Sequence, residues 1–209
     1  MTDGPLTPRK RPIYLVIALV LAFALGTGGW MSGCETIQYY KADDIVLRTD
    51  TSLKEESERP RLKAATEHYI AVRDGAKKRA FPLGVASFLL GAALLSLAAR
   101  GLAGRRGGRS ALVQVVGVQA VLAVVAFVAT REVRWAETEM RVIEAMANSP
   151  RAATTADERV QIEGISRAFA KVMGPAVLGV RSVFALAIIF ALTRPRVRDL
   201  MEASAASDP

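Results

Sequence analysis

Four blocks of apolar residues along the chain are separated by stretches dense in charge. The blocks are residues 13–31, 81–99, 111–130 and 174–193; none contains Asp, Glu, Lys or His, and only the last contains an Arg. A bilayer core of about 30 Å needs roughly 20 apolar helical residues, and soluble core helices rarely run this long without a polar face. We therefore predict an all-α membrane protein with four transmembrane helices.

The charges that flank these blocks predict how the chain is oriented. Three short segments, 1–12, 100–110 and 194–209, hold ten cations, against seven at the opposite edges of the blocks. Short loops rich in Lys and Arg stay in the cytoplasm, and the first span usually dominates. We expect a multi-pass protein of the inner membrane with both termini cytoplasmic, and with residues 32–80 and 131–173 outside.

The first block has a second interpretation. A basic stretch, the apolar run 13–25 and small residues after it are also typical of a signal peptide. Met31-Ser32-Gly33-Cys34 resembles a bacterial lipoprotein cleavage site, which would leave Cys34 as a lipidated first residue. The alternatives are an uncleaved first span or a lipoprotein, and both place Cys34 on the outer side.

The outer segment 131–173 carries two apolar seams with helical spacing. The seams are Val133, Ala136, Met140, Ile143 and Ala147, and then Ile162, Ile165, Phe169 and Val172. Asn148–Pro150 stops the first helix, and Thr155–Glu158 matches a capping box for the second. Spacing by three and four places each seam on one helix face. We predict an antiparallel helical hairpin.

The other outer segment, 32–80, is less regular, but it also contains apolar residues spaced by three and four. Leu62, Ala65, Tyr69, Val72 and Ala76 form a seam that leads directly into the second block. A helix over Glu35–Arg48 would continue outward from the first block. Together with the helix that carries this seam, it would form a second hairpin. Two hairpins packed by their seams would form a four-helix bundle on the membrane. Pro82 predicts a kink.

Arg181 is the most informative polar residue within the blocks. It lies 12 residues from the inner end of its block, about 18 Å deep by helical rise. A charge near the bilayer centre costs at least about 2.5–3.5 kcal/mol, so it should face the bundle interior. Ser87, Gln119 and Thr27 lie at comparable depths and are its candidate partners. Arg181 is then an anion or lipid-headgroup site or a subunit contact, or else it snorkels to the outer surface.

Small residues predict close helix packing in the membrane. They are Ala18, Ala22 and Gly26 in the first block and Ser87 and Gly91 in the second. We expect the run Gly26–Gly29 to loosen the end of the first helix. The motif Leu-Gly-Val-x-Ser occurs at 83–87 and again at 178–182, which suggests an internal duplication.

Composition excludes several kinds of chemistry. The chain has 28 Lys+Arg, 20 Asp+Glu, one His and one Cys. A single Cys excludes an internal disulfide and a four-thiolate metal site, and His68 alone cannot build a paired-histidine haem centre. No nucleophile–base pair and no carboxylate in a block is present. We therefore expect no catalytic residue, metal or cofactor, and no nucleic-acid partner, because the flanking pattern accounts for the basic balance.

These features favour two functions. The first is a non-enzymatic membrane protein that acts through helix–helix contacts as an accessory, scaffold or sensor-like subunit. The second is a small oligomeric channel or transporter with Arg181 at an anion site. Membrane lipids are expected partners in both, together with another membrane protein or further copies of this chain.

Overall fold

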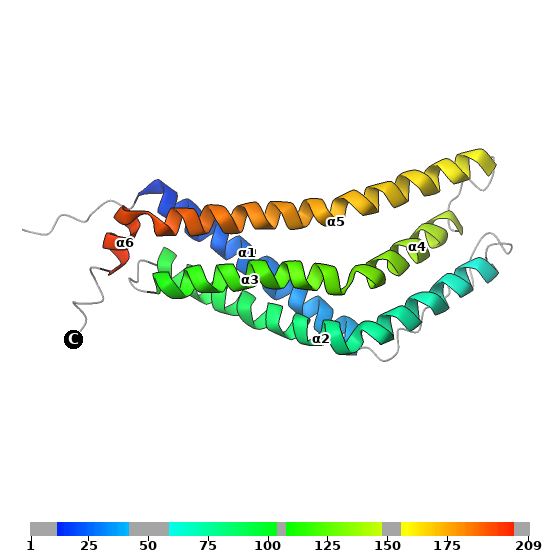
Figure 1. Ribbon diagram of the computed structural model, residues 1–209, viewed down its shortest axis with the longest axis horizontal. Coiled ribbons are helices and arrows are strands. Elements are labelled where there is room, and N and C mark those ends of the chain that lie inside the picture. Colours follow the sequence, from blue (N-terminus) through cyan, green and yellow to red (C-terminus); the bar gives the residue numbers. More distant parts are fainter. Residues whose placement is uncertain (1–11, 42–58, 104–107, 148–155, 203–209) are drawn as a thin grey trace, which may run out of the picture.

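The computed structural model describes residues 12–41, 59–103, 108–147 and 156–202. They form helices α1 (Ile13–Lys41), α2 (Arg59–Leu102), α3 (Arg109–Ala129), α4 (Arg131–Ala147), α5 (Ala156–Thr193) and α6 (Pro195–Glu202) (Figure 1). Nearly every described residue is helical, which confirms the all-α class. Four helices, α1, α2, α3 and α5, are long and apolar enough to cross a membrane by length and composition. Helices α1, α2 and α5 each contain one predicted block whole, and α3 contains the third block up to Ala129.

The apolar blocks pack around one core. Helix α1 lies diagonally across α2 and also meets α5, while α3 packs between α2 and α5. The buried residues of this core are Leu15, Leu19, Ala22, Leu94, Ala98, Leu112, Val116, Ala185, Ile188, Leu192 and Val197. All but Val197 come from the four candidate spans. Val197 belongs to α6, which closes the core beyond the end of α5.

Helices α1 and α2 touch backbone to backbone at glycines. A Cβ atom on Gly33 would lie 2.4 Å from the backbone nitrogen of Phe88, and one on Gly91 would lie 2.3 Å from that of Trp30. Only a residue without a side chain allows such an approach. The predicted close packing of small residues is therefore confirmed. The predicted loosening at Gly26–Gly29 is wrong, because α1 continues without a break to Lys41.

A second core lies at the polar end of the molecule, which we define as the helical residues 59–80, 131–147 and 156–173. Its buried members are Leu62, Tyr69 and Ala76 of α2 and Val133, Ala136, Met140 and Ile143 of α4. These are the two seams that helical spacing predicts. They pack against each other, so α4 has α2 as its neighbour. Tyr39 of α1 adds to this core, and its hydroxyl contacts that of Tyr69.

The seam that helical spacing predicts at the start of α5 is not buried against its neighbours. Ile165, Phe169 and Val172 are 63%, 63% and 65% exposed, and the seam of α4 is already covered by α2. Polar contacts hold the start of α5 instead. Glu163 pairs with Arg61 of α2 at 3.3 Å, and Lys171 lies over the Trp135 ring. The described residues thus form no four-helix outer bundle, because α5 turns a polar face toward its neighbours.

Several predicted boundaries agree with the helices, and others lie outside the described residues. Helix α4 ends at Ala147 and α5 begins at Ala156, as the stop and the capping box predict, although Asn148–Pro150 and Thr155 are themselves outside the described part. The predicted helix Glu35–Arg48 is described as far as Lys41. Helix α2 runs through Pro82 as one element.

Candidate functional site

A cavity of about 240 Å³ lies between the four candidate spans. Helices α1, α2, α3 and α5 all line it, and the first turn of α4 closes one end. Most of the lining is small and apolar. The polar lining consists of Ser32, Thr36, Ser87, Gln119, Thr130, Arg134, Arg181 and Ser182. The cavity forms where the bundle-facing side of α5 changes from large apolar residues, such as Ile188, to Arg181.

Gln119 lies in this cavity against Gly29 of α1. Its Nε2 donates a hydrogen bond to the Leu25 carbonyl at 3.3 Å. A Cβ atom on Gly29 would lie 1.9 Å from that same nitrogen, so glycine is what leaves room for the amide. The Oε1 atom is buried and has no hydrogen-bond partner among the described residues. A buried acceptor without a donor is uncommon in native proteins.

Ser87 binds the opposite side of the same α1 segment. Its Oγ donates to the Gly29 carbonyl at 3.2 Å. Gly29 therefore receives a hydroxyl from α2 while the Gln119 amide of α3 packs against it. The glycine contact between α1 and α2 is what brings these two side chains to one level.

Arg181 points into the bundle and is half-buried. Its Nη2 lies 3.6 Å from the place where a Cβ atom on Gly28 would stand, so the side chain reaches across to α1. Within the described part of the chain, no hydrogen bond or ion pair holds the guanidinium. Arg181, Ser87 and Gln119 line one cavity. Thr27 does not join them: its Oγ1 donates to the Phe23 carbonyl of its own helix at 3.0 Å.

Arg134 is a second cation of the cavity that sequence reasoning grouped with the edge charges. Its guanidinium folds back from α4 toward α3, where it donates to the Thr130 Oγ1 and to the Phe127 carbonyl, both at 2.6 Å. It also lies 3.9 Å from the centre of the Phe127 ring. Burial lowers the pKa of Arg134, but a guanidinium stays charged in proteins. The i, i+4 spacing of Thr130 and Arg134 is the signal that could have indicated this contact.

Ser182 is a further polar lining residue that the predictions missed, as they missed Ser32, Thr36 and Thr130, although the repeated motif pointed toward it. Its Oγ donates to the Leu178 carbonyl at 2.9 Å. Ser87 and Ser182 end the two copies of Leu-Gly-Val-x-Ser, and both copies line this cavity. The repeat therefore brings equivalent positions of α2 and α5 to one site.

The cavity has the charge of an anion site. Among the residues that the structure describes, its lining contains Arg134 and Arg181 and no Asp or Glu. In the described residues, no group of three or more His, Cys, Asp or Glu side chains could hold a metal ion. The Arg181 guanidinium, which no hydrogen bond or ion pair among the described residues engages, gives this mostly apolar space a charged donor that suits a small anion.

Cys34 and His68 lie apart from this cavity. His68 is exposed on α2, and Cys34 is a free, half-buried thiol within α1. Lipidation of Cys34 stays a prediction. Cleavage before Cys34 would remove Leu15, Leu19 and Ala22 from the core.

Comparisons with protein-family models, with curated proteins and with solved structures find nothing that matches this chain.

Proposed function

We propose that the chain is a non-enzymatic integral protein of the inner membrane, with both termini in the cytoplasm, that binds a small anion beside Arg181 as a channel or transporter. One observation carries this proposal. Arg181 faces a cavity formed by all four candidate spans, and none of the described residues that line it is an acid.

The energetics favour an anion as the missing partner. A guanidinium within a bilayer is costly unless another group compensates its charge, and removing one partner of a buried pair typically costs several kcal/mol. No described side chain supplies the negative charge. A cavity of about 240 Å³ is below the usual range for drug-sized ligands, so chloride, phosphate or a small carboxylate is the appropriate size.

Flux through proteoliposomes tests this function. We would compare uptake of labelled chloride and of inorganic phosphate by the wild type, Arg181→Gln, Arg181→Lys and the control Arg100→Gln. The control removes an exposed guanidinium near the end of α2, away from the cavity. We expect Arg181→Gln to lose at least about tenfold in flux, which corresponds to about 1.4 kcal/mol, with partial recovery in Arg181→Lys.

Two results would contradict the proposal. Flux of Arg181→Gln equal to that of the wild type would mean that the cavity holds no transported anion. An equal loss in Arg100→Gln would mean that the effect is general to the positive charge. Folded yield is measured for each variant, because a transport site predicts lost flux with normal assembly.

The outward face of α5 favours a second function. In this function the chain is an accessory or scaffold subunit that acts through helix–helix contacts. Exposed apolar residues follow this face from Ile165 to Phe190, about 38 Å by helical rise. That is longer than the hydrocarbon core of about 30 Å. Part of the face would then need a protein neighbour, because water disfavours exposed apolar surface.

Native mass spectrometry after purification in mild detergent tests this second function. We expect a defined oligomer or a stoichiometric membrane partner with the wild type, and its loss in Phe169→Ser with unchanged flux. A single chain without a companion in the wild-type sample would reject the accessory role.

A further inference from the structure

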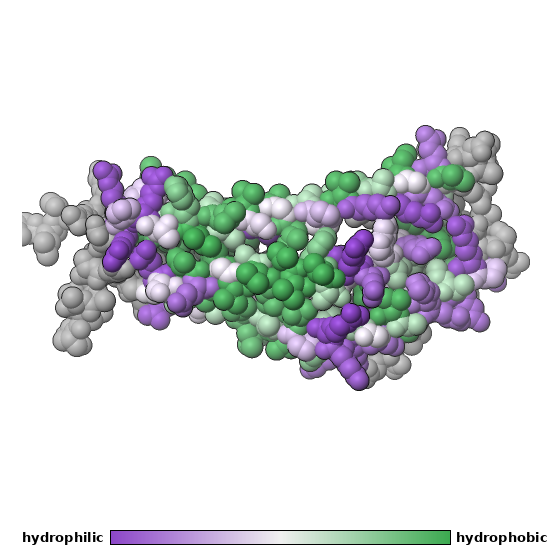
Figure 2. Space-filling view, viewed as in Figure 1, coloured by the Kyte–Doolittle hydropathy of each residue, from purple (hydrophilic) through white to green (hydrophobic). Residues whose placement is uncertain are grey.

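A second, larger hollow of about 800 Å³ lies between α4 and α5. It adjoins the Arg181 cavity, and Phe127, Arg134 and Gly174 line both. Figure 2 shows the molecule opened along α5, with hydrophilic side chains beside the opening near α4. We call this hollow the α4–α5 groove.

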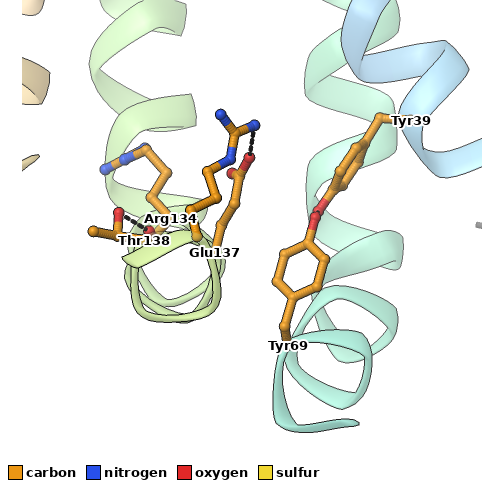
Figure 3. Close-up of polar contacts among 6 residues, drawn as sticks. Tyr39, Tyr69, Arg134, Glu137 and Thr138 are labelled. Carbon is orange, nitrogen blue, oxygen red and sulfur yellow. Dashed lines mark hydrogen bonds and ion pairs between the residues drawn. The ribbon is translucent and has the colours of Figure 1, made fainter. Parts of the chain in front are cut away.

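The groove carries an excess of positive charge. Its described lining includes four cations, Arg131, Arg134, Arg141 and Lys171, and one acid, Glu137. Glu137 is already paired with Arg141 at 2.5 Å, as Figure 3 shows beside Arg134 and Thr138 on α4. Among the described lining residues, no further acid is left to neutralise the other three cations.

These three cations differ in how far their own contacts hold them and in how exposed they are. Arg134 is held by its contacts to Thr130 and Phe127. Lys171 lies 5.1 Å from the centre of the Trp135 ring, and Arg131 stands at the start of α4. Arg131 and Lys171 are exposed, so they are available to an incoming ligand from opposite walls.

The floor of the groove is apolar. Phe127, Val128 and Pro175 line it below the cations, and Val128 is 66% exposed. The floor lies where the third predicted span ends and the fourth begins. Under the proposed topology, that level is the outer headgroup region of the bilayer. Cations above an apolar floor match a molecule with a negative head and a hydrocarbon tail.

We propose that the α4–α5 groove binds the phosphate headgroup of an anionic phospholipid from the outer leaflet. Arg131 and Lys171 contact the phosphate from the two walls, and an acyl chain descends over Val128 and Pro175. Basic pockets between membrane helices recognise lipid headgroups by this chemistry. The phosphate could also come from solution, but the exposed apolar floor favours the lipid. This site adjoins the proposed anion site at Arg181 but binds through Arg131 and Lys171, which line the groove and not that cavity.

Native mass spectrometry of the full chain, released from mild detergent, tests the proposal. The probes are phosphatidylglycerol, phosphatidylcholine and inorganic phosphate, each titrated separately. The test variant is Arg131→Gln with Lys171→Gln, and the matched control is Lys63→Gln with Lys78→Gln, two exposed lysines of α2. We expect the test variant to weaken phosphatidylglycerol binding at least about tenfold and to leave phosphatidylcholine binding unchanged. The control should bind as the wild type does.

Further comparisons distinguish lipid phosphate from inorganic phosphate, and the α4–α5 groove from the Arg181 cavity. Retention of phosphatidylglycerol by the test variant at the wild-type level would overturn the proposal, as would equal affinity of the wild type for inorganic phosphate. Arg181→Gln should keep the lipid even if its flux is lost, and loss of the lipid in that variant would show that the groove is not a separate site. The single charge reversal Lys171→Glu gives a second test, and thermal unfolding checks that each variant is folded.

Discussion

Replacing Gly91 by alanine tests the backbone contact on which the whole site depends. The added methyl group would lie 2.3 Å from the backbone nitrogen of Trp30 and 2.8 Å from its Cα atom. Ordinary van der Waals contact begins near 3.4 Å, so the shortest contact falls short by about 1.1 Å. The obstructing atoms belong to the backbone of α1, which cannot rotate away as a side chain can. Helix α1 must therefore move.

The cost follows from two opposing effects. Alanine in place of glycine within a helix stabilises by about 0.5–1 kcal/mol. Inserting a methyl group into a filled contact destabilises by about 1–3 kcal/mol, and a rigid obstacle favours the upper part of that range. We expect a net loss of about 1–2 kcal/mol. The Ser87–Gly29 hydrogen bond weakens with it, because both helices carry the site.

Gly117 provides the matched control, because a Cβ atom there would meet nothing within 4 Å. Gly117→Ala should leave stability unchanged or raise it by about 0.5–1 kcal/mol. In a chain of this size 1 kcal/mol shifts the unfolding midpoint by about 2–4 °C. Thermal unfolding by circular dichroism in mild detergent should place Gly91→Ala about 4–8 °C below Gly117→Ala. Equal midpoints would refute the backbone contact between α1 and α2.

Two further predictions test the second core and the cavity. Met140→Ala should lower the free energy of unfolding by about 2–5 kcal/mol because Met140 is buried between α2 and α4. Ile165→Ala should change it by no more than about 0.5 kcal/mol because Ile165 is exposed. Chemical unfolding of both variants measures the difference, and equal losses of stability would contradict the packing of α5. Gln119→Leu should leave the unfolding midpoint unchanged or raise it, because it removes a buried oxygen without a partner among the described residues. A lower midpoint in thermal unfolding would show that the amide is stabilising.

The sequence predicted the candidate spans and seams well because both depend on local spacing. Apolar length determines whether a helix can cross a membrane, and steps of three and four determine which side of it is apolar. The seam containing Val133 and Met140 is buried for that reason. The same spacing could not say which helix would cover a seam. Met140 of the first seam packs on α2, whereas Phe169 of the second seam is exposed.

For the candidate site too, some properties follow from the sequence and others from tertiary packing. The sequence by itself determined that Arg181, Ser87 and Gln119 are polar residues within apolar blocks, and that a charge there needs compensation. The tertiary structure alone decided that these three meet in one cavity, that Thr27 does not, and that Arg134 folds back to join them. The reason is physical: a residue's chemistry and depth follow from its place in the chain, but its neighbours depend on how whole helices are rotated and how closely they approach. Contacts such as Gly91 against Trp30 set that rotation and distance.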